Sequence, residues 1–368
     1  MTRIVQVANF VTPTSGGLRT ALRHLAEGYA DRGHEVIQVL PGPVDSIEQM
    51  PWGQRVLLEA PLVPGTGYRV ITKIARVEQV LADLRPERLE VHDRTTLRSL
   101  GSWATAHGVP SLVVSHERLD VWLRQWLPRR LPLRRAAELS NARLAELFDQ
   151  VVCTTTWAGQ EFEQVGATNL RRVALGVDLL AFPPRLGARE ADEVLLLMAS
   201  RLSREKRPDL AVECVRELVR RGTRVRLLVA GEGPLRGRLE RSAAGLPIHW
   251  LGYVTDRTEL AGLMAAADLV LAPGPVETFG LAALEALACG TPVICNRHSA
   301  LSEVVGDAGR AVPSSGFVFA EAVEELLAED ELSRRRAARE RAELFSWDHT
   351  VDGFLAVHGL SRPPVLVR

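Results

Sequence analysis

Lysine is almost absent from this chain of 368 residues. Only Lys73 and Lys206 are lysines among 45 basic residues, and the rest are arginines. Where such a chain uses lysine, the pattern indicates a position that needs a compact ammonium group. Net charge is also absent, because 45 acidic residues balance the 45 basic ones. No overall field therefore attracts nucleic acid or a membrane, and either partner would have to meet a local patch.

Cysteines are few, and long apolar runs are missing. The four cysteines are Cys153, Cys214, Cys289 and Cys295. Their spacing matches no metal motif and each lies in an apolar run, so we expect buried thiols, no metal site and a reduced, cytoplasmic setting. No apolar run approaches about 20 residues, and the first residues lack the apolar core of a signal peptide. We therefore expect neither secretion nor a membrane span.

Length and periodicity favour two α/β domains. The chain is longer than a single hydrophobic core usually supports. Short apolar runs alternate with helical patterns, as in βαβ units that build a parallel sheet. The predicted strands of the first half are Ile4–Ala8, Glu35–Val39, Leu89–His92, Leu112–Ser115 and Val151–Thr154. Those of the second half are Leu195–Ala199, Val225–Ala230, His249–Leu251, Leu269–Ala272 and Val293–Cys295.

Between the two series lies a weakly periodic stretch with proline and glycine, Phe182–Arg189, which we interpret as the interdomain linker. The predicted fold is two Rossmann-like, doubly wound parallel-sheet domains, at residues 1–180 and 190–345. Ligands of such sheets bind at the carboxyl ends of the strands. We therefore expect a shared cleft, with both sheets facing it.

Basic residues follow the strand 195–199. Arg201 and Lys206 lie on a strand-to-helix loop, where α/β domains hold phosphate. A guanidinium grips phosphate oxygens in a bidentate way, and an ammonium acts as a point charge. A solvated basic loop is the alternative. Gly231 and Gly233 follow the next strand and allow close approach of a ligand, although a tight turn explains them equally well.

The segment from Glu277 to Glu285 carries the strongest pattern. It follows the strand 269–272 and opens a helix that Thr278 or Gly280 can cap, and such a helix N-terminus suits an anion. Glu277 lies just before the helix and Glu285 lies within it, so both carboxylates can face one ligand. Carboxylates accept hydrogen bonds from sugar hydroxyls. The pair can therefore hold a ribose and a hexose.

These motifs, in this order and spacing, resemble a family 4 glycosyltransferase of the GT-B fold over nearly the full length. The resemblance implies retaining transfer from a nucleotide-diphosphate sugar without a metal or other cofactor. It also implies a terminal helix, within 347–368, that packs back on the N-terminal domain. Site residues follow position by position. Arg201 and Lys206 resemble the diphosphate clamp, Gly16 and Gly17 the pyrophosphate loop, Glu277 with Phe279 and Gly280 the sugar-binding group, and Glu285 the ribose ligand.

Several stretches are especially similar to the actinobacterial phosphatidylinositol-mannoside mannosyltransferases: Val5–Phe10, Ser15–Leu22, Ser115–Asp120 and Ala272–Pro292. This closer resemblance implies GDP-mannose as donor and a phosphoinositide glycolipid as acceptor. Asp256, where the family places the nucleobase, can accept from two donors of guanine but from only one of uracil. Capping of the following helix is the alternative reading of Asp256.

Histidine closes the strand 112–115. The family places a histidine at the position of His116, touching the donor sugar; a structural role is the alternative. On the acceptor side we expect five residues, of which three close the strand 89–92. They are Asn9, Arg19, His92, Asp93 and Arg94.

A basic, tryptophan-bearing stretch spans residues 122–135. Trp122, Trp126, Arg129 and Arg130 belong to it, and such segments can lie in a membrane interface. We expect this patch to hold the enzyme on the inner face of the plasma membrane. A loop and helix packed on the domain is the alternative. No signal in the sequence decides the oligomeric state.

Other functions explain the sequence less well. A dinucleotide-dependent oxidoreductase would need a G-x-G-x-x-G turn after the first strand and an acid after the second, and neither is present. A UDP-linked donor with a soluble acceptor stays open. So does a sugar-nucleotide-binding protein or epimerase that transfers nothing.

Overall fold

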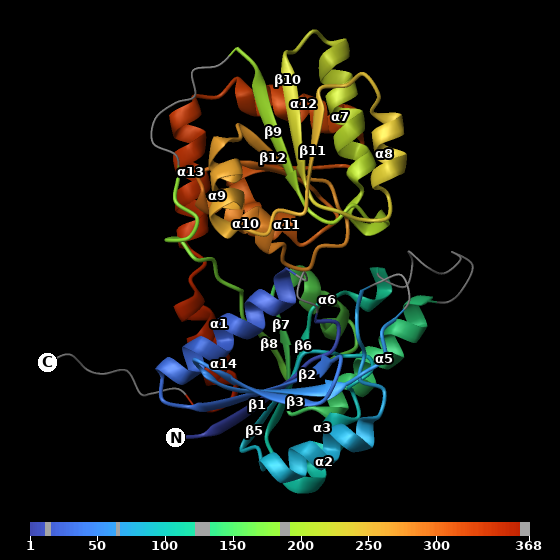
Figure 1. The fold of residues 1–368 in the computed structure, drawn as a ribbon, viewed down its shortest axis with the longest axis vertical. Coiled ribbons are helices and arrows are strands. Elements are labelled where there is room, and N and C mark those ends of the chain that lie inside the picture. Colours follow the sequence, from blue (N-terminus) through green and yellow to red (C-terminus); the bar gives the residue numbers. More distant parts are fainter. Residues whose placement is uncertain (12–15, 64–66, 122–132, 185–191, 361–368) are drawn as a thin grey trace, which may run out of the picture. The chain divides into compact units, whose positions relative to one another are not determined.

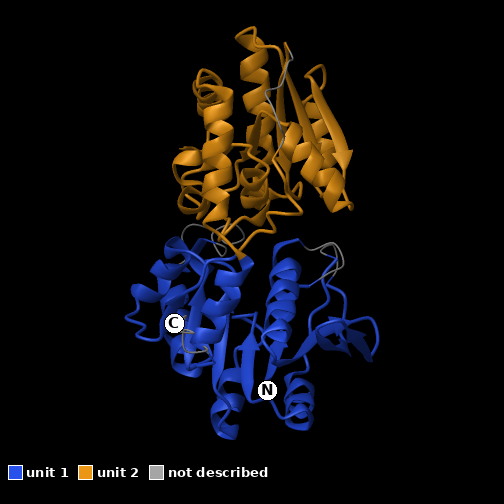
Figure 2. Ribbon diagram, turned by 90° about the vertical axis from the view of Figure 1, so that its left-hand side faces the viewer, with its two compact units in different colours: residues 1–175, 347–368 blue, residues 176–346 orange. Residues whose placement is uncertain are grey.

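The computed structural model describes residues 1–11, 16–63, 67–121, 133–184 and 192–360. The chain divides into two compact units, one made of residues 1–175 with 347–368 and the other of residues 176–346 (Figure 2). Each contains one predominantly parallel sheet covered by helices, as expected for Rossmann-like domains (Figure 1). The fold class predicted from the sequence is confirmed.

Unit 1 contains a sheet of eight strands in the order β3-β4-β2-β1-β5-β6-β7-β8 among the described residues. These strands are β1 (Arg3–Val7), β2 (Glu35–Gly42), β3 (Ser46–Met50), β4 (Gly53–Glu59), β5 (Arg88–Val91), β6 (Ser111–Ser115), β7 (Gln150–Cys153) and β8 (Leu170–Arg172). Of these eight described strands, only β3 and β4 pair antiparallel. The sequence did not show this edge hairpin, because polar residues interrupt it and the mostly exposed β3 has little apolar pattern.

Helices cover both faces of this sheet, which explains why its strands read as continuous apolar runs. The helices are α1 (Gly17–Asp31), α2 (Ile74–Leu84), α3 (Leu100–His107), α5 (Leu133–Leu147), α6 (Thr156–Glu163) and α14 (Trp347–Val357). Alternate residues of each strand face opposite sides. Ile4 packs with Leu25 of α1 and Phe354 of α14. Val5 lies in the other cluster, with side chains of α2, α3, α5 and α6.

The last helix, α14, lies directly on α1. Gly28 of α1 makes this close contact possible, because a Cβ there would lie 2.3 Å from Cγ2 of Val351. Arg32 adds ion pairs to Asp348 and Asp352 at 3.1 and 2.7 Å. The chain therefore returns to unit 1 after completing unit 2.

Unit 2 contains a fully parallel sheet in the order β11-β10-β9-β12-β13-β14, read over its described residues. Its strands are β9 (Val194–Ala199), β10 (Val225–Ala230), β11 (Ile248–Gly252), β12 (Leu269–Ala272), β13 (Val293–Asn296) and β14 (Gly309–Val312). Numbered within the unit, this is the order 3-2-1-4-5-6 of a Rossmann sheet. The strand order reverses between β9 and β12, so the switch point lies where these two strands end.

The helices of unit 2 are η1 (Arg204–Lys206), α7 (Pro208–Arg220), α8 (Arg236–Ser242), α9 (Arg257–Ala266), α10 (Leu281–Ala288), α11 (Leu301–Val305), η2 (Gly306–Ala308), α12 (Gly316–Leu327) and α13 (Glu331–Glu343). One core joins Leu196 and Met198 of β9 to Leu218 of α7 and Phe319 of α12. The four cysteines of the chain are buried free thiols, and burial raises the pKa of each to about 12.

The boundary between the units corrects our expected linker. It falls after Leu175, before the stretch 182–189. Phe182 is fully buried within unit 2, and the Arg257 guanidinium lies 5.0 Å from the centre of its ring. Proline and glycine in a sequence indicate an irregular segment, but they do not show which unit the side chains of that segment pack against.

Candidate functional site

The loop after β9 carries the two cations expected at the diphosphate. Arg201 is exposed, and its Nη2 lies 3.2 Å from Oε1 of Glu205. Lys206 ends η1, just before α7. Two backbone hydrogen bonds to the next loop hold this one, from Ser200 N to Ala230 O at 3.1 Å and from Leu202 N to Glu232 O at 2.9 Å. The cations therefore sit on a backbone that a neighbouring strand end supports.

Gly231 and Gly233 support that loop. A Cβ at Gly231 would lie 1.9 Å from the carbonyl oxygen of Ser200, and one at Gly233 would lie 2.5 Å from that of Leu202. These two glycines thus allow their own loop to lie close against the loop that carries Arg201. We expected Gly231 to make room for the ligand directly. In the structure it makes room for the loop that carries the expected clamp.

Lys206 is paired with Glu277. Its Nζ donates to Oε1 of Glu277, and both side chains are about one-fifth exposed. The two residues follow β9 and β12, the strands between which the order of the sheet reverses. Gly274 brings the segments together, because a Cβ there would lie 3.2 Å from the Cα of Lys206. An acid and a base far apart in sequence thus meet at the switch point, where α/β sheets bind ligands.

Helix α10 begins beside this pair. Its N-cap is Gly280, with a φ of 82°, and no side chain caps the helix. Glycine is needed twice here, since the left-handed backbone disfavours a Cβ and a Cβ would also lie 2.3 Å from Leu301. Phe279 is buried, and its ring meets Phe345 edge to face at 6.0 Å. Backbone N–H groups at such an uncapped N-terminus are suited to an anion.

Glu285 lies one turn into α10. Its Oε1 is 3.7 Å from Nη2 of Arg257, at the start of α9. Burial raises the pKa of Glu285 to about 7, and the nearby Arg257 opposes that rise only in part. The neutral form of this carboxyl group is therefore favoured more than in an exposed glutamate.

Asp256 caps the helix α9. Its Oδ1 accepts a hydrogen bond from the backbone N–H of Thr258 at 2.8 Å. The capping role that we weighed as the alternative is thus present. The side chain is exposed, so capping does not remove it from solvent.

In unit 1 the turn after β1 leads into α1. Gly17 is the first residue of α1, and Gly16 is its N-cap, without a capping side chain. Both glycines are exposed, and a Cβ at Gly16 would meet no atom of the described residues within 4 Å. The open helix N-terminus suits the pyrophosphate role that we predicted for this turn.

His116 follows β6 and is half-buried. Its Nε2 lies 2.9 Å from Nδ1 of His92, and the two rings are stacked with centroids 5.2 Å apart. Burial and the neighbouring His92 lower the pKa of His116 to about 3, although Glu90 opposes the shift. The ring is therefore neutral at physiological pH, suited to a hydrogen bond rather than to a positive charge.

Two family models match the chain in succession. A glycosyl transferase 4-like domain matches residues 16–178, and glycosyl transferases group 1 matches residues 185–343. The chain belongs to the family 4 glycosyltransferases. The family resemblance expected from the motifs is confirmed, and with it the GT-B fold class.

Individual relatives agree with this assignment. Over 97% of this chain and 96% of the relative, the sequence is 47% identical to a GDP-mannose-dependent alpha-(1-6)-phosphatidylinositol dimannoside mannosyltransferase of Mycobacterium tuberculosis. A D-inositol 3-phosphate glycosyltransferase of Saccharomonospora viridis is 29% identical over 94% of this chain and 90% of its own. In structure the chain is similar to sucrose-phosphate synthase of Thermosynechococcus elongatus, with a TM-score of 0.80, 20% identity and 98% of both chains covered.

Like His92, three further residues that we expected to face the acceptor are buried and bonded within the glycosyltransferase. Asn9 is buried and holds the backbone of Ile71, accepting from its N–H at 2.9 Å. Asp93 is also buried, and its Oδ1 accepts from the backbone N–H of Thr95 at 2.8 Å and of Thr96 at 3.1 Å. These side chains stabilise turns beside the sheet. Arg19 is exposed, as an acceptor contact would require.

Arg94 is the third of these residues, and it supports the His116 loop. It is buried and ion-paired with Glu161, and it donates to Oγ of Ser115 at 2.9 Å and to the carbonyl oxygen of Glu117 at 3.0 Å. Glu161 in turn accepts from the backbone N–H of Leu119 at 3.1 Å. This buried pair therefore holds the Ser115 side chain before His116 and the backbone after it.

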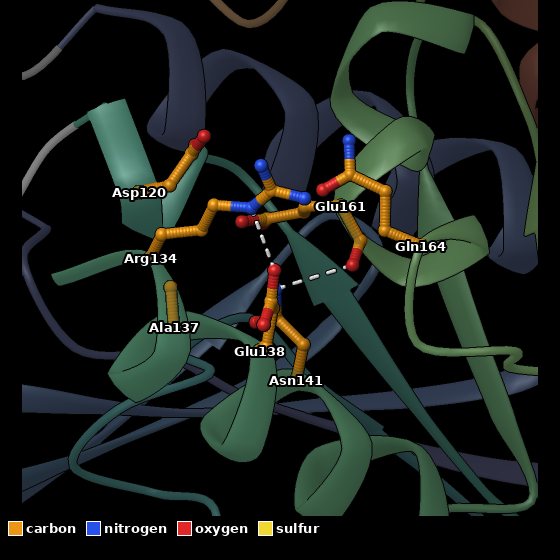
Figure 3. A pocket seen from close by; sticks show the side chains of 7 residues that line it. All are labelled: Asp120, Arg134, Ala137, Glu138, Asn141, Glu161 and Gln164. Carbon is orange, nitrogen blue, oxygen red and sulfur yellow. Dashed lines mark hydrogen bonds and ion pairs between the residues drawn. The ribbon is translucent and has the colours of Figure 1, made fainter. Parts of the chain in front are cut away.

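A small pocket borders that ion pair, between α5 and α6 (Figure 3). Arg134 and Glu138 form a hydrogen bond of 2.7 Å at its rim. Its lining side chains are Asp120, Arg134, Ala137, Glu138, Asn141, Glu161 and Gln164. Among the charged lining residues, Arg134 pairs with Glu138, while Asp120 and Glu161 pair with Arg118 and Arg94 outside the lining.

The expected membrane contacts Trp122, Trp126, Arg129 and Arg130 lie outside the described residues. Within the described ranges, no helix has both the length and the apolar character needed to cross a membrane. Over the same ranges, no three His, Cys, Asp or Glu side chains come together as metal ligands would.

Sequence reasoning missed Glu90, Glu161 and Arg257. Each is a charged residue that contacts an expected site residue or its loop rather than a ligand. For Glu90 a signal existed, because a carboxylate stood in a short apolar strand, two residues before His92 and thus on the same face. For Glu161 and Arg257 the helical pattern offered no comparable signal.

Proposed function

We propose that this glycosyltransferase transfers mannose from GDP-mannose to a phosphatidylinositol-mannoside-type glycolipid, with retention at the anomeric carbon. The observation that carries the proposal is 47% identity, across almost the whole of both chains, to a mannosyltransferase whose name states this donor and a phosphatidylinositol dimannoside. The Lys206–Glu277 pair at the switch point of unit 2 supports it, since the family motif assigns these two residues to the donor.

The proposed chemistry is mainly electrostatic. As the sugar leaves, negative charge grows on the nucleotide diphosphate, and Arg201 and Lys206 meet it. Glu277 accepts hydrogen bonds from the donor sugar, and the N-terminus of α10 contributes its N–H groups. Glu277 holds the ammonium of Lys206. The ammonium therefore needs little rearrangement to lie between a carboxylate and a phosphate.

We further propose that no metal ion takes part. Two cations on a supported loop can supply the charge that a divalent ion supplies in other transferases. His116 is proposed to touch the donor sugar as a neutral hydrogen-bonding group. Glu285 would hold the ribose.

For the nucleobase, Asp256 is proposed to accept from guanine. Its Oδ1 already accepts from Thr258 N in the helix cap, and each carboxylate oxygen can accept more than one hydrogen bond. Capping and base recognition are therefore compatible. Capping would also hold the carboxylate in a fixed orientation.

A second candidate acceptor is soluble D-inositol 3-phosphate or a similar small molecule. The relative named for that acceptor, 29% identical over most of both chains, favours it. Both candidate acceptors contain inositol and phosphate. What separates them is the lipid, and with it the peripheral membrane association that we propose for residues 122–135.

The experiment is a transfer assay with labelled GDP-mannose, UDP-glucose and ADP-glucose against phosphatidylinositol mannosides in vesicles and against inositol 3-phosphate in solution. The proposal expects label in the glycolipid from GDP-mannose alone, with an undiminished rate in excess EDTA. Label in soluble inositol phosphate would favour the second candidate. Transfer from UDP-glucose but not GDP-mannose would contradict the donor assignment, and loss of activity in EDTA would contradict the metal-free mechanism.

A further inference from the structure

Glu90 is a fully buried carboxylate in the middle of β5. Burying such a group costs much free energy unless hydrogen bonds compensate. Here each oxygen has two donors. Oε1 accepts from Gln6 Nε2 at 2.8 Å and lies 2.5 Å from His92 Nε2. Oε2 accepts from the Tyr29 hydroxyl at 2.8 Å and lies 3.0 Å from His358 Nε2.

The register of the sheet builds this site. Gln6 of β1 lies beside Glu90 of β5 on one side and beside Gln38 of β2 on the other. Gln38 donates to the side-chain oxygen of Gln6 at 3.0 Å, which orients the Gln6 amide toward Glu90. Tyr29 comes from α1 and His358 directly follows α14. Segments from both ends of the chain therefore converge on one carboxylate.

His92 connects Glu90 to His116. Its Nε2 faces Glu90, and its Nδ1 lies 2.9 Å from His116 Nε2. Although burial opposes it, the interactions with His92 and His358 hold the pKa of Glu90 well below its usual range. An ionised carboxylate only accepts, so His92 Nε2 carries a proton. A neutral His92 then accepts at Nδ1 from His116 Nε2, whereas a protonated His92 donates from both nitrogens and His116 Nε2 accepts.

The direction of these bonds decides which nitrogen of His116 carries the proton. In other proteins, a buried carboxylate likewise orients a histidine by accepting a hydrogen bond from one of its ring nitrogens. The relay runs from the centre of the sheet to the half-buried ring at the end of β6. If Glu90 and His92 only stabilised the core, their hydrogen bonds would not need to reach His116, the residue proposed to touch the sugar.

We propose that Glu90 and His92 are positioning residues for His116, forming a buried relay that fixes the orientation and tautomer of its ring and ties it to the C-terminal segment through His358. The kinetic part of this inference rests on the proposed function, in which His116 touches the donor sugar. The effect of the relay on the tautomer of the His116 ring can be measured whether or not the protein transfers a sugar.

The test uses the full-length chain with ¹⁵N-labelled histidine. In the wild-type protein, the ring signals of His116, assigned by their loss in His116→Gln, should report one neutral tautomer at neutral pH. His92→Gln should convert them to a tautomer mixture, because the donor and acceptor of a glutamine amide point in other directions than the two ring nitrogens of His92. In the transfer assay, the same substitution should lower kcat about 10- to 100-fold, as loss of orienting groups commonly does. KM for the donor should change by less than about 3-fold, since binding groups stay in place.

Two further variants separate positioning from stability. Glu90→Gln keeps the shape but removes the charge, and should change the His116 signals in the same direction as His92→Gln. Leu112→Ala is the matched control, because Leu112 is buried on the strand beside Glu90 and in register with it. It should lower the melting temperature while leaving the His116 signals and kcat unchanged. If Glu90→Gln fails to fold, the His92→Gln spectrum still decides.

Unchanged His116 signals in folded His92→Gln would overturn the proposal, as would a wild-type kcat. Equal changes in Leu112→Ala would also overturn it, because they would reduce the effect to general destabilisation. If the wild-type chain transfers no mannose, the proposed function fails by itself. The spectra then still establish or refute the relay.

Discussion

The ammonium of Lys206 and the carboxylate of Glu277 are paired across 71 positions of sequence. One residue lies in the connection after β9, and the other lies in the connection after β12. Because these strands are neighbours only through the crossover of the Rossmann sheet, the pair exists only when unit 2 is folded. It holds two expected donor contacts together at the switch point.

Lys206→Ala should lower the catalytic constant by about two orders of magnitude or more, because it removes a charge-assisted contact that strengthens in the transition state. Arg201→Ala should act in the same direction. The measurement is mannose transfer under saturating donor. Arg204→Ala is the matched control, since Arg204 is an exposed cation on the same loop. Wild-type turnover by a folded Lys206→Ala protein would show that the clamp is wrongly assigned.

Glu285→Gln should change how the free energy of unfolding depends on pH. The folded pKa of about 7 lies above the unfolded value near 4.5. The neutral carboxyl is therefore the favoured folded form. Its stabilising effect is fully present below pH 4.5 and is lost as the pH rises through 7. Relative to wild type, the variant should gain stability over this window, by at most about 3 kcal/mol.

Chemical denaturation at pH 5 and pH 8 measures this difference for the Glu285 variant. Glu285→Gln should also remove any rise in nucleotide affinity between these pH values, because an ionised carboxylate accepts ribose hydrogen bonds more strongly than an amide. The same pH dependence of stability in both proteins would place the titrating group elsewhere.

Arg94→Met should destabilise unit 1 rather than weaken acceptor binding. The substitution leaves Glu161 buried without its cation, a change that typically costs about 3–5 kcal/mol. Thermal unfolding should therefore show a lower melting temperature. An unchanged melting temperature with a raised KM for the acceptor would restore our original assignment of Arg94 to the acceptor side.

Asp256→Ala should weaken GDP binding more than UDP binding, measured by calorimetry. It should also cost about 1 kcal/mol of stability through the lost helix cap. Asp330→Ala is the control, because Asp330 caps α13 by accepting from Ser333 N at 2.8 Å, the same distance as in the Asp256 cap. It should lose similar stability without changing GDP affinity. Tighter binding of UDP than of GDP by the wild-type protein would refute the guanine argument.

The protein should sediment with anionic liposomes and be released by salt. With zero net charge, attraction depends on local cations, each worth about 1 kcal/mol near an anionic surface and screened within about 8–10 Å. Replacing Trp122, Trp126, Arg129 and Arg130 together should abolish binding. Unchanged binding by that variant would place the membrane contact elsewhere, and no binding by the wild-type protein would favour a soluble acceptor.

Much of this architecture was predictable from local patterns. Strand-helix alternation indicated two Rossmann-like domains, since continuous apolar strands occur where helices cover both faces of a sheet. The motif residues Arg201, Lys206 and Glu277 were found because each stands in a connection between a strand and a helix, and Glu285 because it lies in the helix after Glu277. The antiparallel β3–β4 hairpin and the position of the unit boundary were not found. Both depend on side-chain packing rather than on periodicity.

By itself, the sequence determined the fold class, the family and the residues expected at the donor. These follow from backbone periodicity and from motifs whose members lie close together in the chain. Only the tertiary structure decided which side chains contact one another. Lys206 pairs with Glu277, Glu285 lies near Arg257, and His116 contacts His92, which contacts Glu90. The tertiary structure also showed Asn9, Asp93 and Arg94 to be bonded within the protein. Such contacts depend on strand order and register, which bring distant residues together and which no local pattern encodes.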